Sequence, residues 1–190
     1  ASTIYHATLN PYWNVPADLA RTLIAPRVLA EGVGYLKDRK YEVLDRFGEG
    51  AHVIDPASVD WAAVAAGTVT VRVRQLPGPA NSMGNVKFGF PNQADIFLHD
   101  TPNKDLFAAS SRSLSNGCIR LSDAPRLARW LMGSDPMQNG AAPEQHVTLP
   151  TPVPIFVTYT TAIADNGSLR YVADVYGKDQ ASGVAVAARR

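Results

Sequence analysis

The sequence has a single cysteine, Cys118, among its 190 residues, and it has no long apolar run. One cysteine cannot form an internal disulfide or a cysteine-rich zinc site, so it is either a buried small side chain or a reactive thiol. No stretch of 18 or more apolar residues occurs, which excludes a transmembrane helix. Lysine and arginine (18) barely exceed aspartate and glutamate (17), which argues against a general nucleic-acid binder.

Composition places the chain among ordinary globular domains. Hydrophobic residues make up 46% and charged residues 18%, which excludes a highly charged disordered tail. A chain of this length predicts one domain over residues 1–190 with a buried core. Residues 1–4 have neither the basic nor the apolar region of a signal peptide, so the sequence itself gives no sign of export.

Short apolar segments separated by turn residues predict a β-rich domain. Val69, Val71 and Val73 alternate with polar residues, which is typical of a half-buried strand. Pro11 and Pro16 interrupt the chain after the first apolar segment. The strands expected are 3–8, 68–74, 94–99, 153–159 and 169–176, with a turn at 165–167, loops over 77–91 and 101–116, and a largely irregular insert over 31–60.

Two segments have the apolar spacing of helices. Residues 18–29 form the first, and Pro26 inside them predicts an end or a kink. The second follows Ser122, which offers a side-chain cap; its apolar stripe includes Trp130, and Gly133 is expected to end it. With the strands, these helices predict a β-rich mixed α+β fold.

The chemistry-bearing segment is 115–120, Ser-Asn-Gly-Cys-Ile-Arg. It places Cys118 on a polar loop, whereas a structural cysteine usually stands among apolar residues. His99 ends an expected strand upstream, and the Ser-rich loop between the two is long enough to bring imidazole and thiol together. An imidazole that takes the thiol proton creates a nucleophile for acyl transfer. A buried, inert cysteine and a structural histidine are the alternative interpretation.

The neighbours of the cysteine fit the same chemistry. Gly117 allows close backbone approach, and its amide and that of Cys118 can donate to the oxyanion of a tetrahedral intermediate. Arg120 can bind a carboxylate through two hydrogen bonds. The remaining histidines match no metal-ligand spacing, so no metal site is predicted; they are His6, His52 and His146. The thiol–imidazole chemistry needs no metal or organic cofactor.

A histidine, a loop and then Ser-x-Gly-Cys-x-Arg resembles the signature of the L,D-transpeptidase family, the YkuD-type catalytic domain that cross-links bacterial peptidoglycan. The resemblance extends over residues 3–178 and is similar to the larger Gram-negative periplasmic members. Its further matches are residues 10–16, 74–79, 87–88, 98–102 and 153–155. It implies a YkuD-like β-sandwich with a helix after the catalytic cysteine and an inserted capping subdomain over 17–67.

The resemblance also implies residue roles. Cys118 is the nucleophile and His99 the base, while the backbone carbonyl of Asp100 orients the imidazole. The amides of Gly117 and Cys118 form the oxyanion hole. Asn116 stands where many members have histidine. The residues implied to contact substrate are Arg120, Ser115, Asn116, Trp13, Phe97 and Tyr12.

The reaction implied begins with attack of Cys118 on the carbonyl before the terminal D-Ala of a tetrapeptide stem. A diaminopimelate amine of a second stem then resolves the thioester to a three-to-three cross-link. The implied partners are the donor and acceptor stem peptides and carbapenem inhibitors, without nucleic acid, in the periplasm of a Gram-negative bacterium.

Other readings of the same residues stay open. Water, a free D-amino acid or a lipoprotein lysine as acceptor gives an L,D-carboxypeptidase, an exchange enzyme or an anchoring enzyme. A non-catalytic peptidoglycan-binding domain is a further alternative, because family members normally have strands before the segment that starts at Asn10. A cysteine endopeptidase of cell-wall peptides fits less well, since such enzymes usually place cysteine before histidine.

Overall fold

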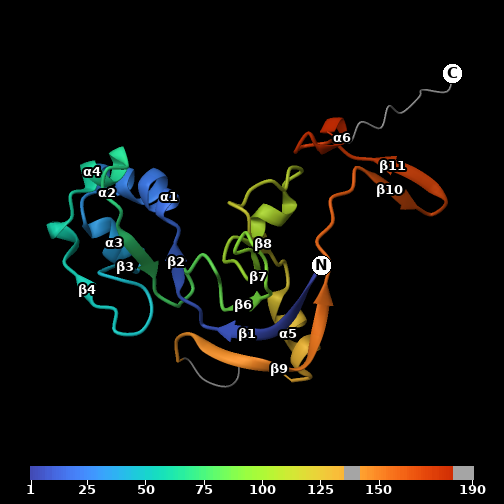
Figure 1. Ribbon diagram of the computed structural model, residues 1–190, viewed down its shortest axis with the longest axis horizontal. Helices are drawn as coiled ribbons and strands as arrows, with labels where there is room; N and C mark the ends of the chain where they lie inside the picture. Colours follow the sequence, from blue (N-terminus) through green and yellow to red (C-terminus); the bar gives the residue numbers. More distant parts are fainter. Residues whose placement is uncertain (135–141, 182–190) are drawn as a thin grey trace. The chain divides into compact units, whose positions relative to one another are not determined.

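The computed structural model describes residues 1–134 and 142–181. The chain divides into one unit of Ser2–Ile155 and a C-terminal unit that begins at Phe156 and includes Ala1 (Figure 1). The β-rich mixed α+β class is confirmed by three sheets and a few short helices. No helix in the described ranges combines the length and apolarity needed to cross a membrane.

A five-stranded sheet forms the centre of the first unit. The strands are, in spatial order, β8 (Ile119–Arg120), β7 (Phe97–His99), β6 (Val86–Gly89), β1 (Ser2–Leu9) and β9 (Gln145–Ile155). Strands β8 and β7 are parallel, and the other neighbouring strands are antiparallel.

The sequence predicted β1, expected over 3–8, correctly and missed β6. Val86 and Phe88 of β6 are fully buried in the core, although the segment lies in what was predicted as a loop over 77–91. The expected strand 94–99 is shortened to Phe97–His99. A four-residue alternation among glycines and prolines is too short to show its strand character before its partners are known.

Each edge strand of this sheet has a feature that limits pairing with a further strand. β8 is only two residues long. β9 carries exposed prolines at 150, 152 and 154, and Pro154 pairs with Thr3 of β1. Proline has no N–H to donate, so it is tolerated on an edge strand and not inside a sheet.

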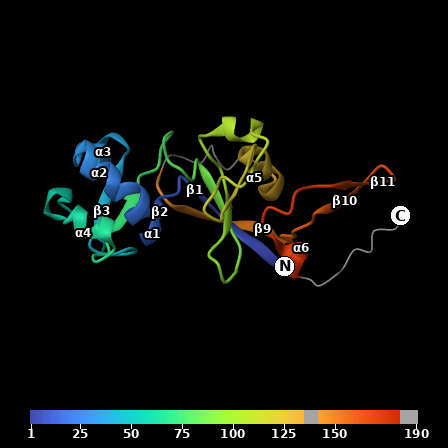
Figure 2. The same ribbon diagram turned by 90° about the horizontal axis from the view of Figure 1, so that it is seen from above.

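The helix after the cysteine, α5 (Ala124–Met132), packs against this sheet (Figure 2). Ala124, Ala128 and Leu131 are its buried residues, whereas Trp130, predicted to lie in the apolar stripe, is 70% exposed. Its cap is Asp123, whose carboxylate accepts from the Arg126 amide, and not Ser122. Gly133, with φ +69°, ends the helix as predicted.

A second sheet and a group of short helices share their own apolar core. Residues 31–60, predicted to be largely irregular, supply a helix and two strands of this region. The sheet order is β2 (Trp13–Val15), β5 (Arg72–Gln75), β3 (Tyr41–Leu44) and β4 (Val53–Ile54). The helices are α1 (Ala17–Leu19), the π-helical η1 (Ala20–Ile24), α2 (Ala25–Glu31), α3 (Gly34–Asp38), the 3₁₀ turn η2 (Pro56–Ser58) and α4 (Trp61–Ala66).

Three local predictions in this region are corrected. The segment broken by Pro11 and Pro16 does leave the first sheet, but its middle residues form β2 in the second sheet. The chain stays helical through Pro26, because a π-helical segment precedes it and Pro26 occupies the first turn of α2. The predicted strand 68–74 begins only at Arg72.

Asn81 joins three segments of the first unit. Its side chain is buried, and its Nδ2 lies 3.0–3.2 Å from the carbonyl oxygens of Pro11, Gln75 and Leu76. Its Oδ1 accepts from the Met83 amide at 2.7 Å. One side chain therefore satisfies backbone groups of a stretch that has no regular secondary structure.

Replacing Asn81 with alanine is expected to lower the free energy of unfolding by roughly 3 kcal/mol, because several buried backbone groups lose their partner. Urea denaturation followed by circular dichroism measures the change. The exposed Asn103→Ala is the control and is expected to stay within about 0.5 kcal/mol of wild type. A loss for Asn81→Ala as small as that of the control would contradict the assignment.

The C-terminal unit contains a β-hairpin and one short helix. Strands β10 (Ala162–Asp165) and β11 (Ser168–Tyr171) pair across Asn166 and Gly167, both at positive φ, as the predicted turn requires. The partner strand is Ala162–Asp165 and not the predicted 153–159, since β9 ends at Ile155. Helix α6 spans Lys178–Ala181.

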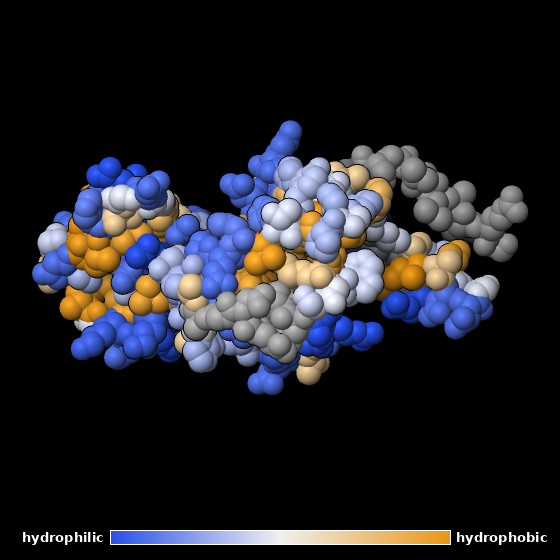
Figure 3. All heavy atoms as spheres, turned by 90° about the horizontal axis from the view of Figure 1, so that it is seen from below, coloured by the Kyte–Doolittle hydropathy of each residue, from blue (hydrophilic) through white to orange (hydrophobic). Residues whose placement is uncertain are grey.

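The surface is mixed in character. On the face drawn in Figure 3, hydrophilic side chains divide the hydrophobic ones into separate patches.

The prediction that residues 1–190 form a single catalytic domain, with 17–67 as its capping insert, stays a prediction.

Candidate active site

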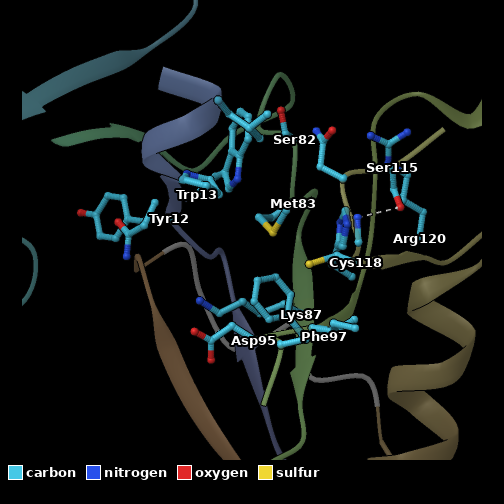
Figure 4. A pocket seen from close by; sticks show the side chains of 18 of the residues that line it. Tyr12, Trp13, Ser82, Met83, Lys87, Asp95, Phe97, Ser115, Cys118 and Arg120 are labelled. Atoms are coloured by element: carbon cyan, nitrogen blue, oxygen red, sulfur yellow. Dashed lines mark hydrogen bonds between the residues drawn. The ribbon is translucent and has the colours of Figure 1, made fainter. Parts of the chain in front are cut away.

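A pocket of about 680 Å³ opens in the first unit (Figure 4). One wall comes from strand β2 and the helical segments α1 and η1 that follow it. The other comes from strands β6, β7 and β8 and the loops beside them. Nine of the ten predicted site residues line it, and Asp100 is the exception. The nine are Tyr12, Trp13, Phe97, His99, Ser115, Asn116, Gly117, Cys118 and Arg120.

Strand pairing places the thiol and the imidazole along the same pocket. β7 and β8 run parallel, with Leu98 opposite Ile119 and His99 opposite Arg120. Cys118 directly precedes β8 and is half-buried, and its sulfur points into the pocket (Figure 4). Because neighbouring strands lie about 4.8 Å apart, side chains of these two strands are within reach of each other.

The neutral imidazole of His99 is held in one tautomer. Its side chain is buried, at 3% exposure, and its Nδ1 contacts the backbone carbonyl of Asp100. A carbonyl oxygen can only accept, so Nδ1 carries the proton and Nε2 has a free lone pair. Burial lowers the pKa of His99 below its usual 6.5, and the positive charges of Arg120 and Lys104 act in the same direction. A neutral imidazole with an accepting Nε2 is the form that a general base needs.

The carboxylate of Asp100 does not take part in this contact. Its oxygens accept from Lys104 Nζ at 2.6 Å and from the Asn85 amide at 3.0 Å. The structure therefore places the carbonyl of Asp100, and not its side chain, against His99. This is the arrangement that the family signature implied, and the catalytic roles themselves stay predictions.

The loop before β8 depends on Gly117. Its φ of +130° is accessible to glycine and strained for other residues, and its amide lies 3.4 Å from Ser115 Oγ. Arg120 donates from a terminal nitrogen to the Leu114 carbonyl at 3.3 Å, while its buried Nε has no hydrogen-bond partner among the described residues. An unpaired buried N–H is costly, and a bound carbonyl or carboxylate oxygen would satisfy it.

Several pocket residues were not predicted from sequence. Lys87 lies directly opposite His99 across β6 and β7. Its Nζ is 2.8 Å from Glu144, which also accepts from the Tyr12 amide at 2.6 Å. Val86 and Phe88 alternate into the core, so Lys87 between them lies on the other face of the sheet. This alternation is the signal that would have found Lys87 if β6 had been predicted as a strand. The other unpredicted lining residues are Asn14, Pro16, Leu19, Leu23, Ser82, Met83, Ala94, Asp95 and Ile96.

Tyr12 is fixed from the second sheet. The guanidinium carbon of Arg74 lies 4.4 Å from the centre of the Tyr12 ring, and Arg74 also pairs with Glu42 at 2.8 Å. This cation–π contact anchors one wall of the pocket.

No group of three histidine, cysteine, aspartate or glutamate residues is placed to hold a metal ion in the part of the chain that the structure describes.

A thiol and a neutral imidazole that share one pocket, on neighbouring strands of a β-rich fold, define a thiol-dependent type of site. The sequence profile of the L,D-transpeptidase catalytic domain (YkuD) matches residues 1–155, and the chain belongs to this family. A Haemophilus influenzae protein named "Putative L,D-transpeptidase" is 34% identical over 186 residues, which cover 94% of this chain. The chain spans 37% of the length of that relative. The family predicted from the signature is thereby confirmed.

Proposed function

We propose that this domain is a peptidoglycan L,D-transpeptidase with Cys118 as nucleophile. The observation that carries the proposal is the shared pocket of Cys118 and His99, in which the Asp100 carbonyl keeps the proton on Nδ1. His99 Nε2 takes the thiol proton while sulfur attacks the carbonyl before the terminal D-Ala of a tetrapeptide stem. The same proton then passes to the departing D-Ala amine, leaving a thioester.

The second half-reaction reverses these roles. The diaminopimelate amine of a second stem attacks the thioester, His99 accepts a proton from that amine, and the thiolate of Cys118 leaves and is reprotonated. The product is a three-to-three cross-link. The amides of Gly117 and Cys118 stabilise the oxyanion in both halves, a contribution of about 2.7–4 kcal/mol for each donor in comparable enzymes.

Substrate binding is assigned to the remaining lining residues. The unpaired Nε of Arg120 supports a role in binding a stem carbonyl or carboxylate. Trp13 and Phe97 supply apolar walls, and Tyr12, Ser115 and Asn116 supply polar contacts. Leu19 and Leu23 also reach the pocket, which supports a capping role for residues 17–67. Peptidoglycan as substrate places the domain in the cell envelope, and we assign it to the periplasm.

The test is incubation with a purified disaccharide tetrapeptide, followed by mass spectrometry of the products. A dimer that has lost one D-Ala is the expected product, and Cys118→Ser is the inactive control. A tripeptide monomer would show water as the acceptor, and incorporation of an added D-amino acid would show exchange, each replacing the cross-linking assignment. Binding by folded protein without any change of mass would instead identify a non-catalytic binding domain.

The pH dependence of acylation follows from the lowered pKa of His99. A histidine with a lowered pKa stays neutral, and therefore competent as a base, at pH values somewhat below 6.5. We expect the rate of carbapenem adduct formation to hold as pH falls through 6.5 and to drop only at lower pH. The free energy of unfolding should decrease as pH falls from 6.5 toward the lowered pKa of the folded protein, because in this interval the unfolded chain binds a proton that the folded chain does not.

The exposed His52, which contacts Asp45, offers a matched control. His52→Gln is expected to leave the pH profile of acylation unchanged. A wild-type profile whose midpoint lies above 6.5 would contradict the neutral-base interpretation.

A further inference from the structure

We propose that Lys104 is a positioning residue of the active site, which acts from outside the pocket by holding Asp100 so that its carbonyl fixes the His99 tautomer. The inference rests on the proposed role of His99 as a base. Asp100 is central because one residue offers two groups. Its carbonyl contacts the imidazole, and its carboxylate contacts Lys104.

Asp100 is fixed at every polar group. It is 6% exposed, and its amide donates to the Val86 carbonyl at 2.9 Å. One carboxylate oxygen accepts from the Asn85 amide at 3.0 Å and the other from Lys104 Nζ at 2.6 Å. A buried carboxylate without its cation would carry a large desolvation cost, so loss of Lys104 should force Asp100 to move.

Lys104 also joins the two strands that carry the reactive residues. Its Nζ makes a second bond, to the Leu121 carbonyl at 3.1 Å. The Leu121 amide in turn donates to the His99 carbonyl at 2.8 Å. One ammonium therefore links the segment after β7, which bears His99, to the segment after β8, which follows Cys118.

Gly84 shows how closely Asp100 is packed. Its φ is +61°, and a Cβ placed there would lie 2.5 Å from Cβ and Cγ of Asp100. Real Cβ atoms do not approach other atoms so closely, and the neighbour is a buried side chain held at both carboxylate oxygens. Gly84 is thus required for the same reason as Lys104, which is the position of Asp100.

The tautomer decides whether His99 can act. If the Asp100 carbonyl withdraws, the proton is free to move to Nε2, and that nitrogen no longer accepts from the thiol. The charged and titratable groups around the imidazole are Arg120 and Cys118 from the β8 side, Lys87 from β6, and Asp100 and Lys104 from the following segment. Loss of Lys104 acts on the pKa of His99 in two opposite directions, because the Asp100 carbonyl contact raises that pKa in the wild type and the Lys104 charge lowers it.

The experiment compares Lys104→Ala and Lys104→Arg with wild type. Lys104→Ala is expected to slow carbapenem acylation roughly 10-fold to 100-fold, which is part of a general base's contribution. Nitrogen-15 NMR of labelled histidine should show the proton on Nδ1 in wild type and a mixture of tautomers in Lys104→Ala. Lys104→Arg, which keeps the charge, should recover part of the rate.

Added ethylamine supplies a chemical rescue. A second pocket, of about 350 Å³, is lined by Gly84, Asn85, Asp100 and Lys104, so a small ammonium ion can reach the place that Lys104→Ala vacates. Concentration-dependent recovery of the rate is expected. Arg27→Ala is the matched control, because it breaks an exposed ion pair of the same i, i+4 spacing, with Glu31, and neither residue lines the pocket.

The outcomes separate this inference from the proposed function. An unchanged rate and tautomer in Lys104→Ala would overturn the inference. A slower rate with unchanged tautomer and no rescue would reduce Lys104 to a general structural role and overturn it as well. A tautomer change in Lys104→Ala, with a wild-type protein that forms no adduct, would support the network and refute the proposed function. Gly84→Ala, where it folds, should change the tautomer in the same way.

Discussion

Cys118→Ala is expected to abolish formation of a covalent adduct between the protein and a carbapenem. Wild type should gain the mass of one inhibitor per chain, because the sulfur faces the pocket beside a neutral imidazole. Removing the nucleophile of a covalent mechanism costs roughly 10⁴-fold or more in rate. Intact-mass spectrometry after timed incubation measures the effect directly.

The fold itself should tolerate Cys118→Ala. The side chain is small and half-buried, so the free energy of unfolding is expected to change by less than about 1 kcal/mol. Cys118→Ser, which keeps an oxygen in place of sulfur, is the second variant. An adduct that persisted in folded Cys118→Ala would locate the nucleophile on another residue. No adduct on folded wild type would argue against an activated thiol.

His99→Ala is expected to slow acylation by roughly 10²-fold to 10⁴-fold, the range contributed by a positioned general base. The thiol would keep its place on the neighbouring strand but would lose its proton acceptor. The change also leaves the Asp100 carbonyl without the imidazole N–H, at a cost of about 1–3 kcal/mol in the free energy of unfolding. Rate measurements must therefore be made below the temperature at which this variant unfolds.

Added imidazole tests whether the loss is chemical. The space left by the His99 side chain lies at the pocket, so free imidazole can reach it and restore part of the rate. His52→Ala removes an exposed histidine and is expected to behave as wild type. Near-normal acylation by folded His99→Ala would remove His99 from the role of base.

Local sequence signals predicted the parts of the site that lie on one stretch of chain. His99 at a strand end and Cys118 on the loop before Arg120 are visible because strand residues, turn residues and charges follow each other directly. The sequence predicts that the long loop between them lets the two residues approach, and the parallel pairing of β7 and β8 places both along one pocket. That pairing joins residues distant in sequence, and no periodicity indicates which strands become neighbours.

The missed features depend on tertiary contacts. Lys87 enters the pocket because β6 lies between β1 and β7, which no local pattern shows. Ser122 and Asp123 both have capping oxygens, so sequence alone does not choose between adjacent positions. Trp130 has the spacing of a buried residue, yet the small Ala128 and Ala124 face the sheet instead. In each case the fold as a whole decides among locally equivalent choices.

The prolines of β9 have a consequence for association with other chains. An open sheet edge normally offers alternating donors and acceptors on which a foreign strand can assemble. Along β9 three positions have no N–H, and at the other edge β8 is too short to template a partner. Growth of this sheet by strand addition, whether into a dimer, an aggregate or a complex with an extended peptide, is therefore disfavoured at both edges.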